Sequence, residues 1–309
     1  METTGSNRSA IIVGSIFAVL QAVLYSTMGI FGKVLYATGL SAEQVIILRY
    51  ACATVLLGGF LLVWRKQALV SKQPSVYVQV LFAFISSVSY FLAVERMSAG
   101  MTTVVFYTYP AVVAVCSTVL FKERFTLSTF VSLVLAMGGL LMVSGVMTGQ
   151  ITLDSLGLVL AIVSCLAFVV YTLLINKTAR VEGPMTVTFT LSWTSFLGSC
   201  VIFAPSVPSL LALTLEQLLI CCGLALACTI LPIPLYIEAV KRIGGTKSSL
   251  LGISETPSSL LLAYLVLGET LTVDQAIGSI LIILSIACVT AAPLLSQMRG
   301  KAEARQAES

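Results

Sequence analysis

Ten apolar runs of helix length fill almost the whole chain, and the second five repeat the first five. The repeated landmarks are a tyrosine, a proline and a glutamate: Tyr90, Pro110 and Glu123, then Tyr236, Pro257 and Glu269. The offset is 146 residues at the tyrosines and glutamates and 147 at the prolines. Because five spans are an odd number of crossings, two such units in tandem lie upside down relative to each other. The pattern predicts an inverted repeat, the architecture of alternating-access transporters.

The composition indicates that these runs fold in a lipid bilayer and not in water. The chain has 309 residues, of which 58% are hydrophobic and only 10% are charged. A soluble protein of this size could not bury so much apolar surface, and a membrane-spanning helix needs about 20 apolar residues. The expected spans are 10–35, 42–64, 75–95, 101–121, 127–147, 155–175, 185–204, 215–238, 248–267 and 273–293.

The predicted fold is an all-α integral membrane protein with ten transmembrane helices in two inverted five-helix repeats. The first repeat is expected over 1–147, the second over 148–295, and a cytoplasmic tail over 296–309. Most lysines and arginines fall on one side of this topology, while Lys33 and Arg96 fall on the other and Arg49 lies within a span. The positive-inside rule then predicts that both termini are cytoplasmic.

Several function classes are disfavoured by what the sequence lacks. It contains no histidine, no glycine-rich phosphate loop and no nucleophile motif, and its eight cysteines all fall in apolar runs. Cysteines in such positions are typical of small buried hydrophobic residues. The sequence therefore predicts no catalytic residues, no metal ligands, no cofactor and no nucleic-acid partner, and the chain is not expected to be an enzyme.

Four stretches carry a family resemblance, three in the first half and one in the second. The segments 25–33 and 47–51 resemble the opening of an EamA domain, and 110–126 and 257–272 resemble its most recognisable part. The chain is similar to two-EamA-domain members of the drug/metabolite transporter superfamily over about residues 12–293. This resemblance implies a secondary transporter of the bacterial cytoplasmic (inner) membrane that exports amino acids or similar metabolites, or else drugs or organic cations. It also implies membrane lipids as partners, coupling to a proton or other gradient, and a monomer or homodimer.

Two departures from the family pattern concern charge. The family often has a glutamate directly before the proline of the second half, whereas here the order is Glu255-Thr256-Pro257. One residue rotates a side chain by about 100° around a helix. Related small pumps use a glutamate in the first helix, where this chain has Gln21. That difference weakens a proton-antiport mechanism of that particular kind.

Matched helix interruptions point to a central cavity. Inverted-repeat transporters bind substrate near the midplane, where broken helices of the two halves meet. Pro110 matches Pro257, and Pro232 with Pro234 corresponds to the serine-rich segment 86–89. Proline frees a carbonyl group one turn back, and serine often bends a membrane helix. We expect the third, fourth, eighth and ninth spans to line the cavity, the alternative being static kinks.

Two charges lie inside spans. Glu255 is the only acidic residue near the middle of a span, and an isolated charge there is costly. It could bind a substrate amine, titrate as a coupling proton site or pair with an internal cation. Arg49 could receive a substrate carboxylate or have a structural role. If the two residues pair with each other, neither needs to touch substrate.

Tyrosines complete the predicted site. Tyr25 matches Tyr171, and Tyr90 matches Tyr236; the inverted topology is expected to place Tyr25 and Tyr90 toward the outer side and Tyr171 and Tyr236 toward the inner side. They form either an outer and an inner gate or an ordinary interfacial belt. The predicted substrate-binding residues are Gln21, Tyr25, Ser89, Tyr90, Tyr107, Tyr171, Tyr236 and Glu255.

Glu123 and Glu269 open short turns at opposite faces and are expected to cap the helices that follow, an effect of about 0.3–1 kcal/mol. They are not predicted to bind substrate. The leading hypothesis is a carrier for small molecules. A receptor or scaffold without flux, or a channel, remains the alternative.

Overall fold

The computed structural model describes residues 3–65, 70–123, 125–146, 154–179, 181–208, 210 and 213–307. Within these ranges all regular structure is helical. Nine helical segments of the described residues are long and apolar enough to cross a membrane, and Leu127–Val143 is a shorter apolar helix. The predicted all-α fold with ten transmembrane helices in two repeats is confirmed.

Each half contributes five crossings, and several are built from two shorter helices. The first half contains α1 (Thr3–Ser26) with α2 (Met28–Ala37), α3 (Ala42–Phe60) with η1 (Leu61–Arg65), α4 (Pro74–Arg96), α5 (Ala99–Phe106) with α6 (Tyr109–Phe121), and α7 (Leu127–Val143). The second half contains α8 (Ser155–Thr178), α9 (Pro184–Ile202), α10 (Leu215–Ala225) with η4 (Leu226–Ile230) and α11 (Pro232–Ile243), α12 (Gly245–Gly252) with α13 (Glu255–Leu267), and α14 (Val273–Ala307). A short η2 (Ala204–Ser206) follows α9.

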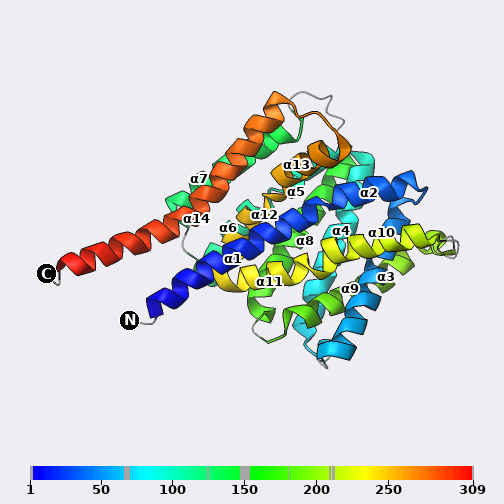
Figure 1. Ribbon diagram of the computed structural model, residues 1–309, viewed down its shortest axis with the longest axis horizontal. Helices are drawn as coiled ribbons and strands as arrows, with labels where there is room; N and C mark the ends of the chain where they lie inside the picture. The colour runs from blue at the N-terminus through cyan, green and yellow to red at the C-terminus, as the bar shows by residue number, and fades with distance from the viewer. Residues whose placement is uncertain are drawn as a thin grey trace.

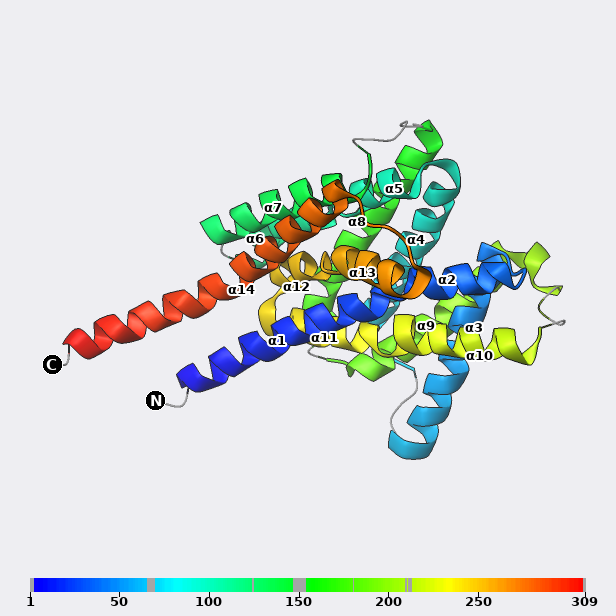
Figure 2. The same cartoon turned by 45° about the horizontal axis from the view of Figure 1, so that its top comes forward.

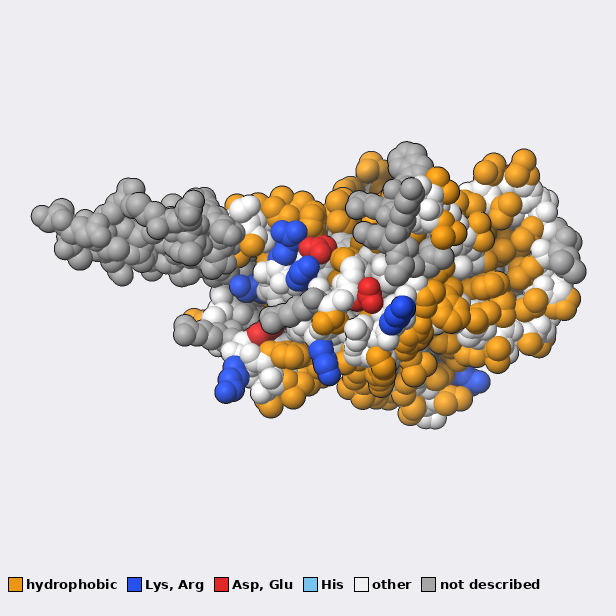
Figure 3. Space-filling model, turned by 90° about the horizontal axis from the view of Figure 1, so that it is seen from below, with side chains coloured by type: hydrophobic (Ala, Val, Ile, Leu, Met, Phe, Trp, Pro, Cys, Tyr) orange, Lys and Arg blue, Asp and Glu red, His pale blue; other side chains and the backbone are white. Residues whose placement is uncertain are grey.

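The two chain ends lie on the same side of the bundle (Figure 1), as an even number of crossings requires. Helices α7 and α14 run side by side along one edge in both Figure 1 and Figure 2, while α1 packs along α11. Much of the surface is apolar. In Figure 3 the visible Lys and Arg side chains lie mostly on the left half, and hydrophobic side chains cover most of the right half. Such a surface is suited to lipid, which the composition predicts.

The predicted breaks at Pro110 and Pro257 occur at matching places. Helix α5 ends at Phe106 and α6 begins at Tyr109, while α12 ends at Gly252 and α13 begins at Glu255. Each proline lies in the first turn of the second helix, where its missing N–H has no intrahelical partner to lose. Pro232 and Pro234 likewise lie in the first turn of α11, after the π-helical turn η4.

The expected partner of that last break is not seen, because α4 is continuous through its serine-rich segment. The hydroxyl of Ser86 donates to the carbonyl of Ser164 on α8 at 2.9 Å, and the hydroxyl of Ser164 donates back to the carbonyl of Ser86 at 2.8 Å. These serines therefore join two helices instead of bonding within their own helix and bending it. An interruption that the sequence did not predict occurs instead in the first span, between Ser26 and Met28.

This reciprocal pair predicts a measurable coupling between α4 and α8. Ser86→Ala and Ser164→Ala are each expected to lower the free energy of unfolding by about 0.6–1.7 kcal/mol, the range for hydrogen bonds between membrane helices. The two side-chain oxygens are also 3.3 Å apart, so the double variant should lose less than the sum of the single losses. Denaturant unfolding of the four proteins in one detergent measures the cycle. Strict additivity would contradict a coupled pair.

The expectation that Glu123 and Glu269 cap the following helices is wrong. The hydroxyl of Thr126 accepts from the N–H of Thr129 at the start of α7, at 3.3 Å. Thr272 accepts from the N–H of Gln275 at the start of α14, also at 3.3 Å. Each threonine lies three residues beyond its glutamate, directly next to the first helical turn, and so reaches the free N–H groups first.

Candidate functional site

A cavity of about 380 Å³ lies between the two halves. Its lining residues come from every crossing except α7 and α14. The volume is in the range of pockets that hold small molecules, about 300–1,000 Å³. The matched interruptions predicted four lining spans, and the structure adds the first, second, sixth and seventh. The predicted residues Gln21, Arg49 and Tyr171 already lay in the first, second and sixth spans.

Most of the residues predicted to bind substrate line this cavity. They are Gln21, Tyr25, Tyr90, Tyr107, Tyr171, Tyr236 and Glu255, together with Arg49. Ser89 is buried but is not a lining residue, whereas Ser86 and Ser87 are. Positions three and four residues apart share a helix face, so Ser86 and Ser87 lie on the face of Tyr90 and Ser89 is turned by about 100°. The lining residues do not include the four prolines, although other residues of the same helices line the cavity: Pro110, Pro232, Pro234 and Pro257.

Sequence reasoning missed several lining residues, most of them aromatic or small: Ser26, Tyr50, Phe106, Tyr109, Phe168, Cys228 and Thr229. Phe106 and Tyr109 flank the break between α5 and α6, so the matched prolines were a usable signal for them. Cys228 and Thr229 belong to η4, a π-helical turn that leaves no pattern in the sequence. Phe168 lies on a continuous apolar helix, where nothing in the sequence distinguishes it from a lipid-facing residue.

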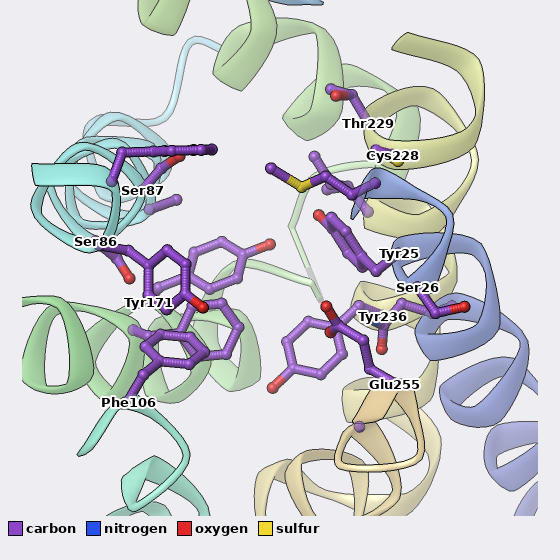
Figure 4. Close-up of a pocket in the computed structure, with 18 of the residues that line it drawn as sticks. Tyr25, Ser26, Ser86, Ser87, Phe106, Tyr171, Cys228, Thr229, Tyr236 and Glu255 are labelled. Carbon is purple, nitrogen blue, oxygen red and sulfur yellow. The ribbon is translucent and has the colours of Figure 1, made fainter. Parts of the chain in front are cut away.

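Glu255 is the first residue of α13, directly after the interruption in the ninth crossing. This position brings its carboxyl group into the cavity wall, beside the hydroxyl of Tyr107. Figure 4 shows Glu255 and Tyr25 on one side of the cavity, with Ser86, Ser87 and Phe106 on the other. The break in the helix therefore places a carboxyl group at midspan.

Arg49 lies on the opposite wall. Its side chain is only 5% exposed, and one terminal nitrogen donates to the hydroxyl of Ser87 at 3.4 Å. The other terminal nitrogen lies 3.6 Å from the sulfur of Met28, and the guanidinium carbon is 4.5 Å from the ring centre of Tyr50. Its Nε is buried without a hydrogen-bond partner among the described residues. Each of these three contacts is with a neutral group.

No ion pair joins Arg49 to Glu255 in the part of the chain that the structure describes. The ion pairs found there are Lys33–Glu269, Arg96–Asp154, and Glu238 with Lys241 and Arg242. The internal pairing considered from the sequence is therefore absent between these two residues. One cavity carries a guanidinium group on one wall and a carboxyl group on the other.

Aromatic rings close one end of the cavity. The rings of Tyr171 and Tyr236 stack with centres 6.3 Å apart and planes 16° apart, and both side chains are 4% exposed. The hydroxyl groups of Tyr236 and Thr172 form a hydrogen bond of 3.0 Å. Phe168 packs against both tyrosines. These rings form a floor on the side of the cavity that faces the chain ends.

The other end of the cavity is more open. Gly29 lines it and is exposed, and Tyr25 and Tyr90 are only half-buried. On the side of the chain ends the helices touch closely, since a Cβ added to Gly14 of α1 would lie 2.7 Å from Ile243 of α11. The cavity is therefore open toward the face opposite the two termini.

Comparisons with known proteins agree with this architecture. The sequence model of the EamA-like transporter family matches residues 12–145 and again residues 155–291. An uncharacterized inner membrane transporter of Salmonella typhimurium, YicL, is 23% identical over 90% of this chain and 95% of its own length. An uncharacterized transporter of Archaeoglobus fulgidus is 28% identical over 65% of this chain and 71% of its own length. One crystal structure superposes with a TM-score of 0.71, at 19% identity, over 94% of this chain and 98% of that chain.

Proposed function

Because the chain belongs to the EamA-like transporter family and is a multi-pass membrane transporter, we propose that it is a secondary-active exporter of amino acids or similar zwitterionic metabolites. The substrate binds in the cavity between the halves, and alternating access moves it across the membrane. Export is proposed from the resemblance to bacterial EamA proteins, with both termini cytoplasmic.

One observation carries the substrate class: Arg49 and Glu255 face the same cavity without pairing with each other. A charge at this depth is costly until a partner neutralises it. An amino acid supplies both partners, because its carboxylate accepts from a guanidinium group and its ammonium group donates to a carboxylate. An organic cation would satisfy Glu255 and leave Arg49 without an anion.

The remaining walls favour a neutral side chain on the substrate. The other lining residues are aromatic, aliphatic or uncharged polar groups, among them Phe106, Tyr109 and Phe168. A third charge on the substrate would lose its hydration there without gaining an ion-pair partner. The cavity therefore suits a zwitterion whose third group is apolar or weakly polar.

The tyrosine pairs are proposed as the two gates. The stacked rings of Tyr171 and Tyr236 form the floor on the side of the termini, and Tyr25 and Tyr90 line the opposite end. In this proposal the halves 1–147 and 148–295 rock against each other. The floor then separates while Tyr25 and Tyr90 approach. Rocking of one repeat against the other around a fixed site is the usual mechanism of inverted-repeat carriers.

Flux measurements in liposomes test this proposal. A purified carrier is expected to take up a radiolabelled neutral amino acid with saturation, and unlabelled amino acid on the opposite side should accelerate the uptake. An imposed proton gradient tests the coupling, and vesicles sorted by orientation test the direction. Conductance without saturation would indicate a channel. Absence of flux for amino acids and for organic cations would leave a receptor or scaffold.

A further inference from the structure

The turns that contain Glu123 and Glu269 have the same backbone. Lys122 ends α6 in the left-handed region (φ 56°, ψ 31°), and Gly268 ends α13 there too (φ 68°, ψ 21°). The N–H of Glu123 donates to the carbonyl of Ser117, and the N–H of Glu269 donates to that of Ala263, both at 3.3 Å. The repeat therefore presents one glutamate at each membrane face in the same local geometry.

The two carboxylates nevertheless have different partners. On the face nearer the chain ends, Glu123 accepts a 2.8 Å hydrogen bond from the hydroxyl of Thr246. It also lies against Gly244, so close that a Cβ there would be 2.9 Å from its oxygen. Gly244 precedes α12 and Thr246 is in its first turn, so the carboxylate lies at the positive end of that helix. Glu123 thus fastens α6 to α12.

On the opposite face, Glu269 forms an ion pair with Lys33 of α2. The side chain of Lys33 is 59% exposed and that of Glu269 is 48% exposed. Ion pairs that are this exposed contribute little to stability. By the 146-residue offset, the counterpart of α12 is α5, whose first turn is capped by the hydroxyl of Ser98. Helices α6 and α12 pack together, whereas α13 and α5 make no comparable contact within the described residues. Glu269 is therefore not placed at α5, the helix that corresponds in the repeat to α12, which Glu123 contacts.

We propose that Glu123 and Glu269 are reciprocal latches that alternate between the two faces. In the conformation seen here Glu123 holds the face of the chain ends closed on α12. Glu269 is held loosely by Lys33 beside the open face. When the cavity turns to the other face, Glu123 leaves Thr246, and Glu269 leaves Lys33 for the N-terminus of α5. The inference rests on the proposed alternating access and adds the residues that set its equilibrium.

The physical basis is a difference between two states. A contact shifts a conformational equilibrium only by the amount that it favours one state over the other. The bond between Glu123 and Thr246 is charge-assisted, and Thr246 is only 8% exposed, so its loss disfavours the closed face markedly. The exposed pair of Glu269 and Lys33 opposes departure of Glu269 only weakly. The observed conformation should therefore depend much more on Glu123 than on Lys33.

Labelling of a cysteine at the open end tests the latches without any substrate. Gly29→Cys is a suitable reporter, because Gly29 is exposed and an added Cβ meets no atom within 4 Å. It is placed in a chain whose eight natural cysteines are replaced, and a membrane-impermeant maleimide is added from that side. Glu123→Ala should slow the labelling about tenfold or more, the effect of losing one hydrogen bond to a charged group. Thr246→Val should slow it in the same direction, which guards against misfolding of the first variant.

The double variant gives the decisive result. Glu269→Ala alone should leave labelling unchanged or faster, and Glu123→Ala/Glu269→Ala should return toward the parent rate. Glu238→Ala is the control, because Glu238 pairs with Lys241 and Arg242 of its own helix. Slowing by both single variants, or no recovery in the double variant, would overturn the latches. If the double variant recovers the parent labelling rate but no amino-acid flux is found, the latch proposal stands and the proposed substrate class is rejected. If amino-acid flux is found but all variants are labelled at the same rate, the latch proposal is rejected and the proposed substrate class stands.

Discussion

Glu255→Gln is expected to reduce transport of a neutral amino acid at least about tenfold, which corresponds to about 1.4 kcal/mol of lost binding. Glutamine keeps the size of the side chain and its contact with the hydroxyl of Tyr107, but it removes the negative charge that faces the substrate ammonium group. Hydrogen bonds to charged groups contribute about 1.5–3 kcal/mol each, so a tenfold loss is a lower bound. Arg49→Gln should cause a similar loss by removing the partner of the carboxylate.

The sharper result is a change of selectivity. With the parent protein, the amino acid should bind better than the corresponding amine or the corresponding carboxylic acid. Glu255→Gln should lose the amino acid and the amine, while the carboxylic acid still binds through Arg49. Arg49→Gln should do the reverse. Competition by the three compounds against labelled amino acid measures all of these affinities, and ligand-induced thermal stabilisation gives an independent measurement.

A matched control separates binding from folding. Glu238→Gln removes a carboxylate that pairs with Lys241 and Arg242 outside the cavity, and it should leave the three affinities unchanged. If Glu255→Gln and Arg49→Gln lower binding of all three compounds equally, the two residues have a structural role and the zwitterion proposal fails. Equal losses would also indicate that the unpaired charges are compensated by something other than substrate.

The fold could be predicted because the 146-residue repeat and the apolar runs extend over almost the whole chain and do not depend on any single residue. Pro110 and Pro257 mark matching breaks since a proline early in a helix needs no N–H partner, and this holds in either half. The break between Ser26 and Met28 has no such marker. There the hydroxyl of Ser26 donates to the carbonyl of Val23, a bond that serines also make inside continuous helices. The local sequence around Ser26 therefore could not show whether the helix is interrupted there or continuous.

The cavity was predictable in its charges and less so in its walls. Glu255 and Arg49 stand out because a charge in a span requires an explanation. Ser86 and Ser89 are chemically identical, and only the helix face and the contact with Ser164 decide which one lines the cavity. Glu123 shows the same limit. Its local sequence favours a cap on the next helix, but its partner Thr246 lies more than a hundred residues away.

Two neighbouring glycines in α7 should respond oppositely to the same substitution. A Cβ on Gly139 would lie 2.5 Å from the carbonyl oxygen of Gly278 in α14 and 2.9 Å from Ile282. The obstacle on Gly278 is backbone, so α7 and α14 would have to move apart along their shared interface. Gly139→Ala is therefore expected to lower the free energy of unfolding by about 1–3 kcal/mol, the cost of overpacking, and Gly139→Val by more.

Gly138 provides the control within the same helix turn. A Cβ there meets no atom within 4 Å, and alanine is about 0.8–1.0 kcal/mol more favourable than glycine inside a helix. Gly138→Ala should therefore leave the melting temperature in detergent unchanged or raise it, while Gly139→Ala should lower it. Equal melting temperatures would contradict the close contact of the two helices. Because neither α7 nor α14 lines the cavity, Gly139→Ala should leave the ligand selectivity of the protein that still folds unchanged.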